Sequence, residues 1–206
     1  MTFLPDGYKE PVTDNYMKFL DGENHFRVLS SAIVGIEFWK EETNKEGEKV
    51  RKPVRRRMTE AITPDEIGVD KNGEPEKMKH FWAFVVYNRD AERIQILEIT
   101  QKTIQRAIKT LAGNTKWGDP QEYDIVVTRS GEKFETEYVV QPDPKEKIDE
   151  AIVNEYKAMN INLEALFDGD DPFKTQEDVE DRNDDSAKED MEIRDEEIDE
   201  IFDGKE

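Results

Sequence analysis

Residues 79–111 read KHFWAFVVYNRDAERIQILEITQKTIQRAIKTL, and this stretch decides the fold that we expect. It opens with a run of aromatic and β-branched residues over 80–87, a composition that favours a pleated, half-buried strand. Turn-forming residues follow over 88–91, and a second apolar run of strand length covers 93–99. Because the connection is short, we expect the two runs to pair as an antiparallel hairpin.

A helix is predicted directly after this hairpin. Thr100 suits the N-cap position, and Gly113 stands just past the expected end. Apolar residues recur at the spacing of one helical face, and they are Ile104, Ala107, Ile108 and Leu111. The opposite face carries three cations, Lys102, Arg106 and Lys109.

The elements on either side of this segment complete the expected fold. Downstream, strands over 123–128 and 134–141 flank a turn at 129–132. Upstream, a long β-prone region over 24–40 is expected to break at Ser30 and Ser31 and again at Gly35. The expected order is therefore one long bent strand, a hairpin, a helix and a second hairpin. This is the element order of the five-stranded OB-type barrel, whose helix lies between strands 3 and 4. We therefore predict a mainly β fold of this type, and OB barrels commonly bind oligonucleotides.

Length and composition exclude several classes of protein. The chain has 206 residues, enough for one domain with a substantial core and an additional segment. It contains no cysteine, which excludes disulfides and thiolate metal sites. No apolar run approaches the roughly 18–20 residues of a membrane span, and the N-terminal segment lacks the basic and apolar regions of a signal peptide. We therefore expect no membrane association and a cytoplasmic location.

Negative charge is concentrated at the C-terminal end. Of the formal net charge of −20, residues 151–206 carry −15 and residues 1–150 carry −5. The segment 168–206 holds nineteen acidic and five basic residues with almost no aromatics, so we expect it to be disordered. The predicted organisation is an N-terminal arm (1–22), an OB-fold nucleic-acid-binding domain (23–144), a helical segment (145–167) and a disordered acidic tail (168–206).

Positive charge gathers in the polar connection over 41–78, where only Val54–Met58 is expected to form a short strand. Single-strand binding needs cations that contact phosphates and rings on which bases stack, at about 1–3 kcal/mol per base. The candidate nucleic-acid-binding residues are Trp39, Arg51, Lys52, Arg55, Arg57, Lys77, Lys79, Trp82 and Tyr87. The alternative for each aromatic residue is a place in the core, because a strand has two faces and the pattern over 80–87 leaves open which one is buried.

The acidic tail has two interpretations. It is either a solubility tail or a tethered polyanion that competes with nucleic acid for a basic groove. In the second case its apolar tip, Ile198, Ile201 and Phe202, would bind partner proteins. Catalysis is not expected, because the only histidines are His25 and His80 and no nucleophile or phosphate-loop motif stands out. We likewise expect no metal and no cofactor.

Residues 17–141 resemble the single-stranded DNA-binding proteins of bacteriophages, of the type that joins an OB barrel to an acidic tail. The resemblance rests on short blocks, which are FL at 19–20, GENHFRVL at 22–29, KPVR at 52–55, KHFWAFVV at 79–86, ILEITQK at 96–102 and WGDP at 117–120. Some members hold zinc through Cys and His, and the absence of Cys here predicts no such site. Tails of this class often end in a terminal Phe, whereas Phe202 here is followed by DGKE.

The resemblance implies a sequence-independent protein that coats single-stranded DNA in phage replication, recombination and repair, in the cytoplasm of the infected bacterial host. It also implies that the acidic tail recruits replication or recombination proteins. A different class remains open, an acidic interaction protein such as a DNA mimic or a chaperone of basic proteins, which would act through its tail. RNA as the ligand is a closer variant, and the oligomeric state is left open.

Overall fold

The computed structural model describes residues 14–43, 47–70 and 73–174. These residues form a mainly β structure, with one mixed sheet and few helices. The strands are β1 (Tyr16–Met17), β2 (Gly22–Val28), β3 (Ile33–Thr43), β4 (Lys49–Arg57), β5 (Lys79–Asn88), β6 (Arg93–Ile99), β7 (Asp124–Ser130) and β8 (Glu137–Pro142). The α-helices are α1 (Lys102–Ala112), α2 (Glu150–Ala158) and α3 (Ala165–Asp168), and short 3-10 helices cover Pro64–Glu66, Pro120–Glu122 and Lys133–Glu135.

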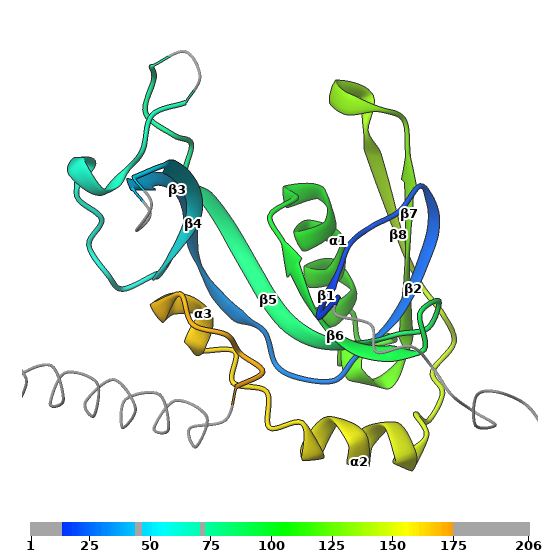
Figure 1. The fold of residues 1–206 in the computed structure, drawn as a ribbon. Helices are drawn as coiled ribbons and strands as arrows, with labels where there is room; N and C mark the ends of the chain where they lie inside the picture. Colours follow the sequence, from blue (N-terminus) through cyan, green and yellow to red (C-terminus); the bar gives the residue numbers. More distant parts are fainter. Residues whose placement is uncertain (1–13, 44–46, 71–72, 175–206) are drawn as a thin grey trace, which may run out of the picture.

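Strand β5 lies at the centre of the sheet. The strand order is β1-β6-β5-β2-β7-β8, and β3 joins β4 to the other end of β5. The β1–β6 pair is parallel, and the other pairs are antiparallel. In Figure 1 the β3–β4 and β7–β8 hairpins rise on opposite sides, with α1 between them. Within the described residues the two ends of the sheet do not pair, so the sheet is open and a closed barrel is not confirmed.

The central segment follows the sequence prediction except at the start of its helix. The β5–β6 hairpin is antiparallel, as expected. Gln101 occupies the N-cap position with extended backbone angles, so the prediction of Thr100 there is wrong. The first turn is instead fixed by Gln105, which is buried and donates from Nε2 to the carbonyl oxygens of His80 (3.0 Å) and Ile99 (2.8 Å). These bonds place α1 beside the start of β5.

The expected long bent strand is present, with one break rather than two. Residues 29–32 separate β2 from β3, which confirms the break at Ser30 and Ser31. The predicted break at Gly35 is wrong, because β3 continues through it. A Cβ at this position would lie 2.5 Å from the carbonyl oxygen of Arg56 and 2.7 Å from the ring of Phe81. Gly35 is therefore required by close packing and not by a turn.

Two connections differ from the sequence prediction. The short strand predicted at Val54–Met58 is the end of the nine-residue β4, so the irregular connection is 58–78 rather than 41–78. Four arginines, three of them consecutive at 55–57, hide this strand from a search for hydrophobic periodicity. The turn predicted at 129–132 is longer, because a 3-10 helix follows it and β8 begins only at Glu137.

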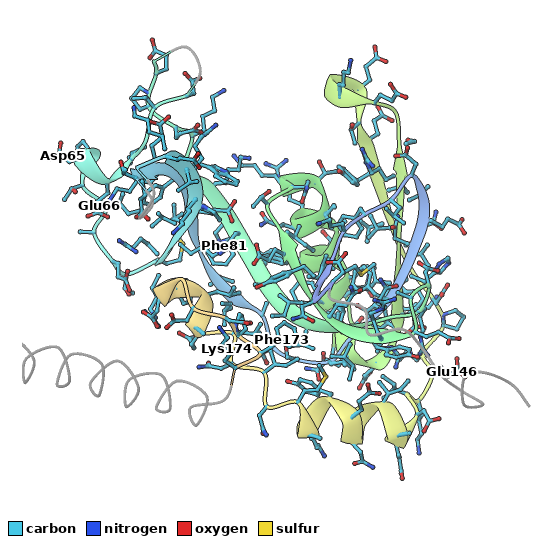
Figure 2. All side chains as sticks on the ribbon, in the orientation of Figure 1. Asp65, Glu66, Phe81, Glu146, Phe173 and Lys174 are labelled. Atoms are coloured by element: carbon cyan, nitrogen blue, oxygen red, sulfur yellow. The ribbon has the colours of Figure 1, made fainter. Side chains whose placement is uncertain are left out.

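Both faces of β5 are buried. The inner face carries Phe84 and Val86, which join residues of β2, β6, β7 and α1 in the main core. The outer face carries Phe81 and Ala83, which pack against Phe167 and its neighbours from the C-terminal segment. Figure 2 labels Phe81 on β5 and Phe173 in that segment. The terms inner face and outer face are kept below for these two sides. The sequence pattern left open which face of residues 80–87 is buried. In the structure both faces are buried, each in its own core.

The C-terminal segment folds back onto the sheet. Two short helices, α2 and α3, replace the single helical stretch expected over 145–167, and they lie on the opposite side of the sheet from α1 (Figure 1). Phe173 also packs on the outer face, so order extends past the predicted tail boundary at residue 168. The predicted partner-binding residues Ile198, Ile201 and Phe202 lie outside the described residues, as does most of the acidic tail. In the described part of the chain, no helix is both long enough and apolar enough to span a bilayer.

Candidate nucleic-acid interface

The strand register separates the predicted site residues onto two faces. Gly35 pairs with Arg57 on one side and with Phe81 on the other, which puts Arg57 on the outer face. Alternate residues of a strand share a face. The predicted residues on the outer face are Trp39, Arg51, Arg55, Arg57, Lys79 and Tyr87, whereas Lys52 and Trp82 belong to the inner side.

Arg55 lies within an ion-pair cluster in the sheet. Its guanidinium is 2.6 Å from the carboxylate of Glu98 and 3.4 Å from that of Glu37, and it also lies over the ring of Phe81 at 5.8 Å. The Arg55 side chain is only 14% exposed, so it pairs with these two carboxylates and offers little surface to a phosphate. Burial raises the pKa of the Glu37 carboxyl, against the lowering effect of the Arg55 charge. Arg55 therefore serves to neutralise two half-buried acids.

Arg57 attaches the C-terminal segment to β4. Its guanidinium lies 2.8 Å from the carboxylate of Glu164 and 3.2 Å from that of Glu60. The same group stacks over Phe167 at 4.6 Å from the ring centre. Hydrogen bonds to Glu164 and then Glu60 raise the pKa of Arg57. These contacts give Arg57 a structural role on the outer face.

The remaining cations of the predicted cluster differ in how far they are paired. Arg51 forms an ion pair with Glu76 and lies 5.6 Å from the ring centre of Trp39. Lys52 is 63% exposed and 3.7 Å from Glu42, a separation that leaves the ammonium largely in solvent. Lys77 and Lys79 are exposed, and among the described residues no carboxylate forms an ion pair with either of them. The two lysines are therefore the most available of the six predicted cations.

The predicted aromatic residues do not form one platform. Trp39 and Tyr87 are half-buried near opposite ends of the sheet, and each ring carries an arginine, Arg51 or Arg89. Trp82 is half-buried on the inner face, where it packs against the main core. These three rings cannot stack successive bases of one short strand.

Three further residues on the inner side of the sheet were not among the predicted site residues. His80 contacts Trp82 edge to face, with 6.3 Å between the ring centres. Lys102 precedes Gln105 by three residues, and Lys109 follows it by four. Residues at these spacings share a helix face, so both lysines lie on the side of α1 where Gln105 bonds to His80. Both lysines are exposed, and neither forms an ion pair with a residue that the structure describes. The cationic stripe on this helix was the sequence signal, but only the fold shows that Lys109 lines the same pocket as Trp82.

A pocket of about 370 Å³ adjoins this group. Trp82 and Phe84 line it from β5, and Lys109 and Ala112 line it from α1. The β2–β3 bend and residues 119–121 supply its other walls. In the described parts of the chain, no group of three or more His, Cys, Asp or Glu side chains could hold a metal ion.

Comparisons of this chain with protein-family models, with curated proteins and with solved structures find no match. The functional interpretation therefore depends on the residues themselves. Their arrangement joins an aromatic pair, a pocket and two lysines of α1 on the inner side of the sheet. We define this group as the His80–Lys109 surface (His80, Trp82, Lys102 and Lys109).

Proposed function

We propose that this protein binds single-stranded DNA without sequence preference, through the His80–Lys109 surface. The observation that carries the proposal is the juxtaposition of His80 and Trp82 with Lys102 and Lys109, cations that have no ion-pair partner among the described residues. Cations beside aromatic rings form the usual combination for binding single strands. In this proposal the lysines contact phosphates, and His80 and Trp82 contact bases.

An OB-type architecture supports the same proposal. The bent strand β2–β3 would be the first barrel strand, followed by β5 and β6, then α1, then β7 and β8. Apart from the additional strands β1 and β4, this is the element order of an OB fold. Side chains from β2, β5, β6, β7 and α1 converge on one core, as barrel strands do. Helix α1 packs against β8, and β6 and β8 do not pair within the described residues. We therefore infer that α1 completes the barrel at this position.

The wider role that we propose is that of a bacteriophage protein that coats single-stranded DNA during replication, recombination and repair in the host cytoplasm. This part depends on the sequence resemblance, as does recruitment of partner proteins by the acidic tail. Neither role requires catalysis, a metal or a cofactor.

The experiment that tests DNA binding is a titration of tryptophan fluorescence with a mixed-sequence single-stranded oligonucleotide at several salt concentrations. The informative variant is Lys102→Ala with Lys109→Ala. For single strands, each phosphate contact contributes about 0.7 to the slope of log affinity against log salt. We expect the double variant to lower that slope by about 1.4 and to weaken binding at low salt.

The matched control removes the same charge elsewhere, with Lys18→Ala and Lys157→Ala, because both lysines are exposed and distant in sequence from the surface. This control should change the slope little, since neither lysine is a proposed phosphate contact. Equal slopes for the two double variants would remove the His80–Lys109 surface from the proposal. An RNA strand of the same length, titrated in parallel, tests whether DNA is preferred.

One observation favours the second candidate, an acidic interaction protein that acts through its tail. Arg51, Arg55 and Arg57 are paired with carboxylates of the same domain, so the sequence cluster that suggested a polyanionic ligand is largely neutralised internally. If that candidate is correct, the full chain binds no oligonucleotide at low salt but binds a basic protein such as a histone.

A further inference from the structure

The pocket beside Trp82 is a consequence of the bend between β2 and β3. Val28 pairs with Val86, and Ile33 pairs with Ala83, so four residues of the bend face a short stretch of β5. The Ser30 hydroxyl accepts a hydrogen bond from the backbone N–H of Val85 at 2.9 Å and so holds the bend against the strand. The bend therefore makes an opening into the inner side of the sheet.

Small side chains keep this opening unfilled. Ser31 and Ala32 border it from the bend, and Ala112 borders it from the last turn of α1. All three are exposed. The volume of about 370 Å³ falls in the range of about 300–1,000 Å³ that is typical of small-molecule sites. The pocket is therefore open to solvent where these three residues border it.

The lining defines the chemistry of a ligand. Val28, Phe84 and Ile108 give apolar walls that suit the faces of a flat ring. The Nε1–H of Trp82 is shielded from solvent and has no hydrogen-bond partner among the described residues. A buried donor without an acceptor is costly, so a ligand whose entry moves the ring and supplies an acceptor gains from pairing with it. Lys109 adds a cation at the same pocket.

These features match one unit of a nucleic acid strand. A nucleobase has two apolar faces and acceptor atoms on its edge, and it is attached to a phosphate that Lys109 would attract. His80 contacts the Trp82 ring edge to face on the same side of the sheet. The acidic side chain at the pocket, Asp119, already accepts from the backbone N–H of Gln121 at 3.0 Å.

We propose that this pocket receives a single nucleobase turned out of the bound strand, with Trp82 as a hydrogen-bond donor to the base rather than as a stacking platform. This inference depends on the proposed function, because it places one base of the same strand. It predicts that part of the affinity comes from bases and depends on one indole N–H, while the phosphate contacts are independent of it.

The test compares an oligothymidylate with an abasic strand of the same length, bound to the full chain at low salt. Trp82→Phe keeps an aromatic ring but removes the N–H. We expect this variant to bind the oligothymidylate about fivefold more weakly, the ratio that corresponds to one net hydrogen bond of typical strength. Its affinity for the abasic strand should equal that of the wild type.

A second variant avoids any change to Trp82. Ala112→Phe places a ring at the pocket and should weaken oligothymidylate binding but not abasic binding. Thr110→Phe adds the same ring to an exposed position of α1 that does not line the pocket, and it should leave both affinities unchanged. Thermal melting confirms that each variant is folded.

Two results would overturn the inference while leaving DNA binding intact. One is unchanged oligothymidylate affinity in both Trp82→Phe and Ala112→Phe. The other is an equal loss on both strands, which would give Trp82 only a supporting role. If the wild-type chain binds neither strand, the proposed function itself fails, and the pocket has no nucleobase to receive.

Discussion

Phe167→Ala tests whether the C-terminal segment is an integral part of the folded domain. Phe167 is 7% exposed, with its ring centre 5.8 Å from that of Phe81 and 4.6 Å from the Arg57 guanidinium. Truncating a buried Phe costs about 3–5 kcal/mol. A cluster at the edge of the molecule can collapse partly, so we expect the lower end of that range, about 3 kcal/mol. The lost cation–π contact adds roughly 0.5–1 kcal/mol.

The assay is urea unfolding followed by tryptophan fluorescence. The predicted loss of about 3–4 kcal/mol is a large share of the 5–15 kcal/mol that stabilises a typical domain. The control is Phe173→Ala, because Phe173 is half-buried at the margin of the same cluster and should cost clearly less. A loss below about 1 kcal/mol for Phe167→Ala, or one no larger than that of Phe173→Ala, would refute the packing argument.

The same variant also locates the DNA strand. In OB folds the face of strands 2 and 3 commonly binds oligonucleotides. If β5 and β6 are those strands, the outer face is covered here by residues 161–173. Loosening that cover in Phe167→Ala should leave DNA affinity unchanged if the strand binds the His80–Lys109 surface. Tighter binding would instead place the strand on the outer face.

Two further predictions concern the sheet. Gly35→Ala should destabilise the protein by about 1–3 kcal/mol, because its Cβ would lie within 3 Å of Arg56 and Phe81. The control is Gly113→Ala, where φ is −80° and no atom lies nearer than 3.4 Å to the added Cβ. It should be neutral or slightly stabilising in the same urea assay. Glu37→Gln should change the pH dependence of stability. Burial raises the pKa of Glu37 above its ordinary 4.5, so the folded state holds the proton more tightly than the unfolded state does. The wild type should therefore lose stability relative to Glu37→Gln as the pH rises through that raised pKa. A difference in unfolding free energy that stays constant between pH 4 and pH 8 would contradict the assignment.

Local patterns were enough to predict the elements of the central segment. The aromatic and β-branched run of β5, the apolar run of β6 and the helical spacing of Ile104 and Ile108 each indicate one type of structure. The exception was the helix start, because Gln105 fixes it through carbonyl groups of residues 80 and 99. That bond to His80 spans a distance in sequence that no capping pattern includes.

The candidate site was predicted less well, because charge pairing across a sheet depends on register. The basic run 51–57 suggested a free cationic loop, but it lies antiparallel to β3, which carries Glu37, Glu41 and Glu42. Two such runs, one acidic and one basic, are a signal for a charged hairpin that hydrophobic periodicity does not detect. The stripe Lys102–Lys109 was visible in the sequence, yet its position beside Trp82 follows from the packing of α1 on β5.

Local charge, rather than the net charge of −20, decides whether this chain can bind a polyanion. Charges farther apart than about 10 Å are largely screened at 0.1 M salt, so a phosphate at α1 responds mainly to the side chains around it. There, Lys102 and Lys109 have no ion-pair partner among the described residues, whereas the arginines of β4 are paired with carboxylates of their own domain. The internal pairing of β4 thus removes its basic run from the binding surface, and the cations that remain lie beside the aromatic pair and its pocket. If the proposed function is correct, that distribution predicts binding of single-stranded DNA that is strong in low salt and weak in high salt.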